Sequence, residues 1–422
     1  MNIRYFIFPL IFFPSITFGL VPAEIFPWAF IVAIFYFKKN YKDFLKIIII
    51  FLPSIIIAIY ANVATIDIIR SLFAYLNVFF IFIVVLKFND KDLNILIKVL
   101  KYSLILIILI TIIQYLIPQI NMILQYLVPR LQIYSSGVFK TDYAGHSGLS
   151  SEPSRHATEV IMLYVTYVLV SNNSKYLRIV KDTFVALFIL LLNRSISGIF
   201  FLSIYAFIIY IDLIKNFKFL FFSIFILILS LIFIFTVNWT YIFNLSFFDF
   251  KSLNFIKQLY EFQNIQLIFD KIWYWSGFRF SSILSAYLNP TFFGYGMGNW
   301  YQASSIGYDL NLYLKTSEWF VLHCSDGIEC GHRPTALLAG LILEIGIIPI
   351  IILALFLRKI VNKNYDTGKF NIPKNINIKF IWLFILSLVL LGNIGDPVVA
   401  TCIAILFNAY YKNFYRKKIE IK

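Results

Sequence analysis

Long runs of apolar residues, separated by short polar segments, dominate the pattern along the chain. Most of the runs approach the ~20 residues that a helix needs to cross the hydrocarbon core of a membrane. The pattern predicts twelve spans, near residues 5–20, 22–37, 47–63, 71–88, 102–117, 157–170, 183–193, 197–213, 219–237, 335–356, 380–392 and 397–411. The first run also fits a secretory signal, because Arg4 precedes it and Val21-Pro22-Ala23 resembles a weak cleavage site. The short run at 183–193 is expected either to start earlier, near Tyr176, or to stop short of crossing.

Composition supports this interpretation. The 422 residues are 60% hydrophobic and only 14% charged, whereas soluble domains have roughly 25% charged residues. We therefore expect an all-α polytopic membrane protein in which residues 1–422 form a single integral membrane domain, with no soluble catalytic domain. Four His and three Cys are too few for a Cys/His metal cluster, and no Gly-rich phosphate loop is present. Neither a metal nor another cofactor is expected.

The positive charges predict the orientation of the spans. The formal net charge is +15, and with the N-terminus inside, most of the 36 Lys and Arg residues fall in segments on the inner side. Cytoplasmic segments of membrane proteins carry such an excess. Both termini are therefore expected in the cytoplasm. The basic excess is an orientation signal, and we expect no nucleic-acid partner.

On this topology two long segments face outward, near residues 118–156 and 238–334. Each contains an apolar pattern at helical spacing, around 120–128 and around 280–288, which is typical of helices that lie in the membrane interface. One large asymmetric outer loop, without an inverted pair of interrupted spans, argues against a two-fold transporter. Function should be sought in these two segments.

The first candidate motif is the segment 148–157, which leads directly into a span. Pro153 suits the first helical turn, so Glu152 is expected at the cap position, close to the positive helix end. A regular helix would place Glu152, Arg155, His156 and Glu159 on one face. The alternative is a capped helix start whose charges pair with one another at the membrane boundary. Glu159 lies inside the span, where a carboxylate is expected to face a partner or a cavity.

Two further motifs present arginines on the outer side. Arg194 lies in a tight turn between two apolar runs, and it could equally be an anchor to the lipid headgroups. Arg279 lies at the edge of an apolar helical stripe, where it could face a phosphate group. The alternating glycines that follow, Gly294, Gly296 and Gly298, would let the backbone approach a ligand, although such a pattern also occurs in plain turns.

The fourth motif runs from Cys324 to Arg333, ahead of a run that contains Glu344 and Gly346. In an oxidising compartment, Cys324 and Cys330 would close a small disulfide loop and position His332 and Arg333. A metal site of the two cysteines with His323 and His332 is the alternative. Cys402, inside the last run, is expected to be a core residue.

Together, these motifs resemble those of the O-antigen polymerase (Wzy) and O-antigen ligase superfamily. The resemblance lies in Gly-Leu-x-x-Glu-Pro-Ser at 148–154, Arg-Ser-x-Ser-Gly at 194–198, Ser-Gly-x-Arg at 276–279 with the glycines after it, and His332 ahead of Glu344-x-Gly346. It implies a GT-C-like glycosyltransferase in the bacterial inner membrane, acting at the periplasmic face on undecaprenyl-diphosphate-linked sugars without a metal. Membrane lipids and a chain-length regulator protein are the partners to expect. The Glu-Pro-Ser element favours a polymerase over a ligase.

The residues fit this chemistry independently of the resemblance. Undecaprenyl diphosphate is already a good leaving group, so the site needs cations for the growing charge and a base for the acceptor hydroxyl. Arg grips phosphate oxygens with two hydrogen bonds, and the candidates are Arg155, Arg194, Arg279 and Arg333. Glu152 and His332 are the candidate catalytic bases, and their order stays open. An O-antigen ligase and a lipid-linked sugar flippase remain alternatives.

Overall fold

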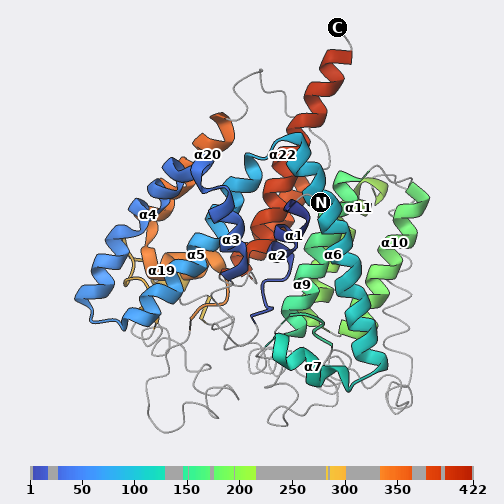
Figure 1. Cartoon of the computed structure of the whole chain (residues 1–422), viewed down its shortest axis with the longest axis horizontal. Helices are drawn as coiled ribbons and strands as arrows, with labels where there is room; N and C mark the ends of the chain where they lie inside the picture. The colour runs from blue at the N-terminus through green and yellow to red at the C-terminus, as the bar shows by residue number, and fades with distance from the viewer. Residues whose placement is uncertain are drawn as a thin grey trace.

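A computed structural model describes most of the chain, and its described part is helical (Figure 1). The described residues are 3–17, 27–128, 146–150, 152–171, 175–193, 195–214, 282–283, 286–300, 333–363, 377–390 and 395–420. Within them no β-strand occurs. The expected all-α class is therefore confirmed for this part of the chain. The expected spans at 219–237 and the motifs at Arg194, Arg279, Cys324, Cys330 and His332 lie outside it.

The first half of the chain forms helices in close succession. They are α1 (Arg4–Ile7), α2 (Pro9–Phe12), α3 (Pro27–Phe35), α4 (Phe37–Tyr60), α5 (Thr65–Leu86), α6 (Asp90–Leu116) and α7 (Ile120–Leu127). The side chain of Asn89 caps α6 by accepting a hydrogen bond from the backbone N–H of Asp92 at 2.8 Å. Short polar turns thus separate long apolar helices, as the pattern predicts.

The rest of the described chain contains α9 (Pro153–Val170), α10 (Lys175–Phe188), the π-helical turn η1 (Ile189–Asn193), α11 (Ile196–Ile214), α19 (Leu337–Ile345), α20 (Ile347–Lys363), α21 (Asn377–Leu390) and α22 (Pro397–Glu420). The run at 183–193 does start earlier, at Lys175, because α10 continues into η1. The predicted interfacial helix near 120–128 is α7, a short helix with a strongly one-sided apolar pattern.

Three described helices, α4, α5 and α6, are long and apolar enough to cross a membrane. The hydrocarbon core is about 30 Å thick, and a helix rises about 1.5 Å per residue. The 24, 22 and 27 residues of these helices satisfy that length. Many of their apolar side chains are exposed in the isolated chain, including Ile48, Ile49, Leu52, Ile105 and Leu109. By length and composition, these three helices are able to cross a membrane.

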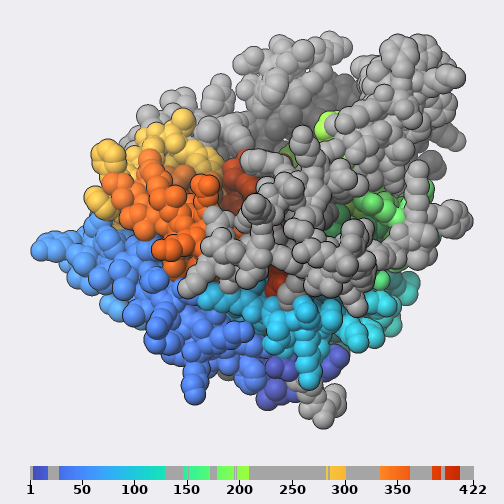
Figure 2. All heavy atoms as spheres, turned by 90° about the horizontal axis from the view of Figure 1, so that it is seen from above, coloured from blue at the N-terminus to red at the C-terminus, as the bar shows by residue number. Residues whose placement is uncertain are grey.

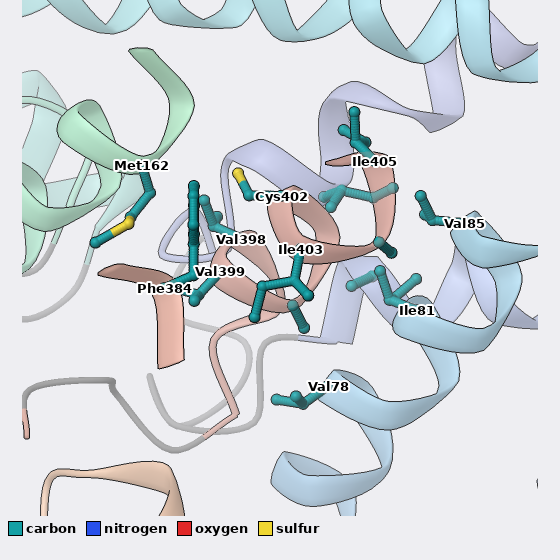
Figure 3. Close-up of a cluster of buried hydrophobic side chains, with 14 of the residues drawn as sticks. Val78, Ile81, Val85, Met162, Phe384, Val398, Val399, Cys402, Ile403 and Ile405 are labelled. Carbon is teal, nitrogen blue, oxygen red and sulfur yellow. The ribbon is translucent and has the colours of Figure 1, made fainter. Parts of the chain in front are cut away.

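The core lies where α22 packs between α5 and α9 (Figure 3). Val78, Ile81 and Val85 of α5 face α22, Met162 approaches from α9, and Phe384 from α21. Cys402 is buried in this cluster, as expected. One continuous set of buried apolar residues therefore joins helices from α2 to α22, whereas Leu124 of α7 belongs to a separate small cluster.

Polar contacts define two ends of this bundle. At one end Arg4 pairs with Asp92 at 2.6 Å, and Lys87 pairs with Asp43. Asn408 of α22 donates there to the last carbonyl groups of α5. We call this the basic end. The α7 end is opposite, where α6, α7 and the start of α9 meet (Figure 1).

Two expected spans differ from the structure. The run at 335–356 is broken at Gly346, whose φ of 81° ends α19 and separates it from α20. An uninterrupted span there was therefore a wrong prediction. At the N-terminus the described helices α1 and α2 cover only Arg4–Phe12. Pro9 has no N–H and separates the two helices. Pro14 disfavours a helical conformation of Phe13, where α2 ends. Nine residues are less than half of what a span requires.

Candidate functional site

The α7 end of the bundle contains two clusters of buried charged residues. The first, the α9 cluster, consists of Arg155 and Glu159 on α9 and Asp396 just before α22. Arg155 Nε donates to Glu159 Oε1 at 2.8 Å, and its Nη2 donates to Asp396 Oδ2 at 3.3 Å. The three residues are 7%, 4% and 5% exposed. Since buried charges are costly unless paired, this arrangement links α9 firmly to α22.

Neighbouring groups complete the α9 cluster. The Ser150 hydroxyl donates to Glu159 Oε2, and the backbone N–H of Val398 donates to Asp396 Oδ1 at 2.9 Å. Asp396 thereby caps the start of α22, where an acidic side chain is favourable. The expectation that Glu159 faces a partner is confirmed. The carboxylates of Glu159 and Asp396 already balance the charge of Arg155. Its role as a diphosphate ligand therefore stays a prediction.

Glu152 occupies the N-cap position of α9, and Pro153 is the first helical residue, both as predicted. The side chain of Glu152 does not bond the helix N–H groups; instead the Ser154 hydroxyl donates to its Oε2 at 3.4 Å. Glu152 also contributes to the electrostatic environment of Arg155. The carboxylate therefore lies close to the α9 cluster, half-buried at the α7 end.

Side chains from η1 and α6 hold the loop before α9 and the first turns of α9 itself. Asn193 donates to the carbonyl groups of His146 and Pro153 at 3.1 and 2.9 Å. The Thr111 hydroxyl of α6 donates to the Ile107 carbonyl of the same helix at 2.9 Å. The hydroxyl oxygen therefore accepts from His156 Nε2 at 2.8 Å. His156 thus faces α6 rather than the acidic side chains of its own helix. Asn193 and Ser195 flank Arg194, which itself lies outside the described residues.

The second group, the α19 cluster, centres on Glu344, which is fully buried near the end of α19. Its Oε1 accepts from Arg333 Nε and from the Tyr75 hydroxyl, each at 2.9 Å. Its Oε2 accepts from the backbone N–H of Gly298 at 2.9 Å. Arg333 lies over the rings of Tyr75 and Trp300, 5.2 Å from each centroid. Three donors, one of them a guanidinium stacked on two rings, therefore stabilise one buried carboxylate.

Arg333 retains unused bonding capacity. Within the described part of the chain, its Nη2 is buried without a hydrogen-bond partner. Burial lowers the pKa of its guanidinium, but the Glu344 carboxylate and Tyr75 raise the pKa by more, and the net value lies above the ordinary one. Arg333 is therefore a permanent cation whose Nε is held by Glu344, and whose buried Nη2 has no hydrogen-bond partner among the described residues.

The glycine-rich segment supports the α19 cluster by joining the two halves of the broken helix. The N–H groups of Tyr295 and Gly296 donate to the last carbonyl groups of α19, and the first N–H groups of α20 donate to the carbonyl groups of Thr291 and Phe292. Backbone groups at helix ends lack partners within the helix, and this segment supplies them. In the surface view, residues 286–300 lie directly against α19 and α20 (Figure 2).

The glycines make this close approach possible. A Cβ at Gly294 would lie 2.3 Å from the Glu344 carbonyl oxygen, and one at Gly346 would lie 2.2 Å from the Gly294 nitrogen. Both residues have positive φ. The interpretation of this glycine pattern as a ligand cradle is therefore corrected, since the backbone that it approaches belongs to α4, α5 and α19.

Helix α5 separates the two clusters. Tyr75 contacts Glu344, whereas Asn77 donates to the carbonyl of Gly395, next to Asp396, at 3.3 Å. Residues two apart differ by about 200° around a helix. Arg155 and Arg333 thus occupy the same end of the bundle but opposite faces of α5. The described residues do not bring the two arginines together.

The sequence missed two residues that complete the clusters. Asp396 precedes Pro397 at a helix start, a pattern that resembles Glu152-Pro153 and would have marked it. Tyr75 lies in a uniformly apolar run and carries no such signal. Among the described residues no group of three His, Cys, Asp or Glu side chains could hold a metal ion.

Comparison with known proteins gives no assignment: no family model, no curated protein and no solved structure matches the chain. The fold and the site therefore define a class only. It is a helical protein with at least three helices able to cross a membrane and two buried ion-pair clusters at one end.

Proposed function

We propose that this chain is a polytopic inner-membrane glycosyltransferase that polymerises undecaprenyl-diphosphate-linked repeat units of O-antigen or a similar surface polysaccharide. In this proposal about twelve spans adopt a GT-C-like arrangement, and the α7 end faces the periplasm. Supporting it are the order of the four motifs along the chain, the basic residues at the other end, and the position of Glu152, Arg155 and Arg333 at the α7 end, on two faces of α5.

The observation that carries the proposal is the set of contacts that Arg333 makes. Its Nε is held by Glu344, its plane is covered by two aromatic rings, and its Nη2 has no partner among the described residues. A preorganised donor of this kind stabilises an anion without reorganising during the reaction. The growing charge on a leaving diphosphate is such an anion.

The reaction joins an acceptor-sugar hydroxyl oxygen to the anomeric carbon of the donor. The bond from that carbon to the diphosphate oxygen breaks, and undecaprenyl diphosphate leaves with the electron pair. The acceptor proton passes to Glu152 or His332, the candidate bases. Arg194, Arg279 and Arg333 bind the diphosphate in this proposal. Arg155 completes the set of cations, with its guanidinium held by Glu159 and Asp396.

The substrate and partners follow from this chemistry. The donor and acceptor are both lipid-linked oligosaccharides, delivered within the membrane, and membrane lipids surround the spans. A chain-length regulator protein is a further partner in this proposal. No nucleic acid and no cofactor takes part.

The direct test uses purified protein in proteoliposomes with undecaprenyl-diphosphate-linked repeat units. The expected result is a ladder of longer lipid-linked products, lost in Arg333→Ala. In cells, a deletion strain should carry a single repeat on its lipopolysaccharide core. A bare core together with lipid-linked polymer would instead identify a ligase.

One observation favours a second candidate, a lipid-linked sugar transporter. The helix broken at Gly346 beside a buried carboxylate resembles the discontinuous helices that line transport sites. Such a protein would move lipid-linked sugars across the proteoliposome membrane without lengthening them, so the same preparation distinguishes the two.

The orientation has its own test. Reporter fusions after Lys39, Lys218 and Lys363 should read cytoplasmic, and fusions near Ser147 and Tyr308 should read periplasmic. A cytoplasmic signal at Ser147 would place the α9 cluster on the wrong side for periplasmic chemistry.

A further inference from the structure

The end of η1 is bonded to the start of α9 and to the segment before it. The His146 N–H donates to the Leu192 carbonyl at 3.0 Å, and the Asn193 amide donates to the His146 carbonyl at 3.1 Å. Asn193 also donates to the Pro153 carbonyl at 2.9 Å. One side chain thus holds both ends of the segment that carries Glu152.

The chemistry of Asn193 suits this position. The residue is fully buried, and its short planar amide carries two N–H donors. Both hydrogen-bond partners are carbonyl oxygens, which need donors, so the NH₂ group must point toward them. Within the described part of the chain, the Asn193 amide bonds these backbone carbonyl groups and no side chain. It therefore acts on the position of the backbone.

A second contact, from α11, strengthens the same junction. The Ser197 hydroxyl donates to the Ser154 carbonyl at 3.3 Å. Close packing accompanies this bond, because a Cβ at Gly198 would lie only 2.7 Å from the Ala157 Cβ. The π-helical turn η1 ends at Asn193, and such turns occur frequently at functional sites. The first turn of α9 is therefore fixed against η1 and α11.

We propose that Asn193 is the positioning residue for Glu152, the candidate base at the N-cap of α9. Glu152 lies in the chain between the two carbonyl groups that the amide holds, so the position of its carboxylate depends on both hydrogen bonds. A general base must lie within hydrogen-bonding distance of the hydroxyl that it deprotonates, and a displacement of about 1 Å can lower a rate roughly a hundredfold. The inference rests on the proposed glycosyl transfer with Glu152 as the base.

The test measures polymerisation kinetics in the proteoliposome assay. Asn193→Ala should lower kcat about tenfold to a hundredfold with little change in substrate KM, because a displaced base slows the chemical step and not substrate binding. Asn193→Asp keeps the size of the side chain but offers at most one donor, so it should lower kcat by less. Normal kcat in both variants would make the proposal wrong. If Asn193→Ala does not fold, Asn193→Asp alone decides.

Asn408→Ala is the matched control. Asn408 is also a buried asparagine whose amide donates to backbone carbonyl groups, those of Val85, Leu86 and Phe88 at the basic end. Its removal should lower the melting temperature as Asn193→Ala does, but leave kcat per folded protein unchanged. An equal loss of kcat in both variants would show that the rate reports only the integrity of the fold, and the proposal would be wrong.

A double-mutant cycle with Glu152 separates positioning from an independent role of Asn193. Glu152→Gln should lower kcat about a hundredfold or more, as expected for the loss of a general base. In that background Asn193→Ala should lower kcat by less than about twofold further, since no base remains to be positioned. Equal factors in the two backgrounds, or a normal kcat in Glu152→Gln, would overturn the inference.

The outcomes also distinguish this inference from the proposed function. Wild type that lengthens no lipid-linked sugar would contradict the proposed function, and the inference would be wrong with it. Polymer from wild type with unchanged kcat in the Asn193 variants would contradict the inference alone. Hydrogen–deuterium exchange of residues 146–150 should be faster in Asn193→Ala and unchanged in Asn408→Ala. Unchanged exchange in both would show that the Asn193 amide does not hold this segment, and the proposal would be wrong.

Discussion

The α9 cluster and the α19 cluster bury charge at the same end of the bundle in different ways. In the α9 cluster one guanidinium faces two carboxylates, and the backbone and Ser150 satisfy their remaining oxygens. In the α19 cluster one guanidinium faces one carboxylate, and Arg333 Nη2 stays unused within the described residues. The first arrangement is suited to holding helices together. The second is suited to presenting a donor to an anion.

The largest expected effect is on stability, from the α9 cluster. Arg155→Ala leaves two buried carboxylates without their cation, and breaking a buried ion pair by removing one partner costs about 3–5 kcal/mol. Thermal unfolding of the detergent-purified variant should show this loss as a much lower melting temperature. If the variant is as stable as wild type but inactive, Arg155 acts on the substrate, and the contrast between the clusters disappears.

The next effect is on activity, from the α19 cluster. Arg333→Ala removes a preorganised donor, which typically lowers the rate roughly a hundredfold, and Arg333→Lys should recover little because it loses the planar fork. Polymer length in the proteoliposome assay measures the effect. Because Glu344 keeps two other donors, we expect a smaller change in melting temperature than for Arg155→Ala. Normal polymer from both variants would rule out this arginine as the anion donor.

A substitution at Gly346 tests the close contact between the glycine-rich segment and the junction of α19 and α20. Gly346→Ala would force a Cβ to within 2.2 Å of the Gly294 nitrogen at a φ of 81°. A strained residue of this kind costs about 1–3 kcal/mol, and both the melting temperature and activity should fall. Ala354→Gly, on the exposed face of α20, is the control and should lose only helix propensity, about 1 kcal/mol.

A milder change tests the positioning of Arg333. Tyr75→Phe deletes the hydroxyl that donates to Glu344 but keeps the ring beneath the guanidinium. A hydrogen bond to a charged group contributes about 1.5–3 kcal/mol, part of which the remaining donors to Glu344 recover. We expect polymerisation to fall roughly tenfold with little change in substrate KM. An unchanged rate would show that Glu344 does not need this hydroxyl to orient Arg333.

The smallest effect is expected from an ion pair at the same end that is not buried. Arg70 lies 3.5 Å from Asp67, and both side chains are about 30% exposed. Exposed pairs contribute only about 0–1 kcal/mol, so Arg70→Ala should have nearly normal stability and polymer. A large loss of stability or of polymer would mean that an arginine contributes because it lies at the α7 end, and not because it is buried.

The pattern of the chain predicted the local features well. The start of α9, with Glu152 as cap and Pro153 as first residue, follows from preferences that act within one helical turn. The earlier start of α10 and the helix α7 follow from apolar spacing alone. The expected orientation, which stays a prediction, also needs no tertiary information, since alternating spans carry alternate connections to opposite sides.

Other features depend on residues far apart in the chain. Tyr75 and Glu344 are 269 positions apart, and Arg155 and Asp396 are 241 apart. A buried carboxylate needs a hydrogen-bonding or charged partner. The residues next to it in the sequence do not indicate which helix supplies that partner. The glycine pattern likewise predicts that the backbone comes close to another segment, but it does not identify that segment. Only the packing of α5 between the two clusters, and of the glycine-rich segment against α4, α5 and α19, decides these pairings.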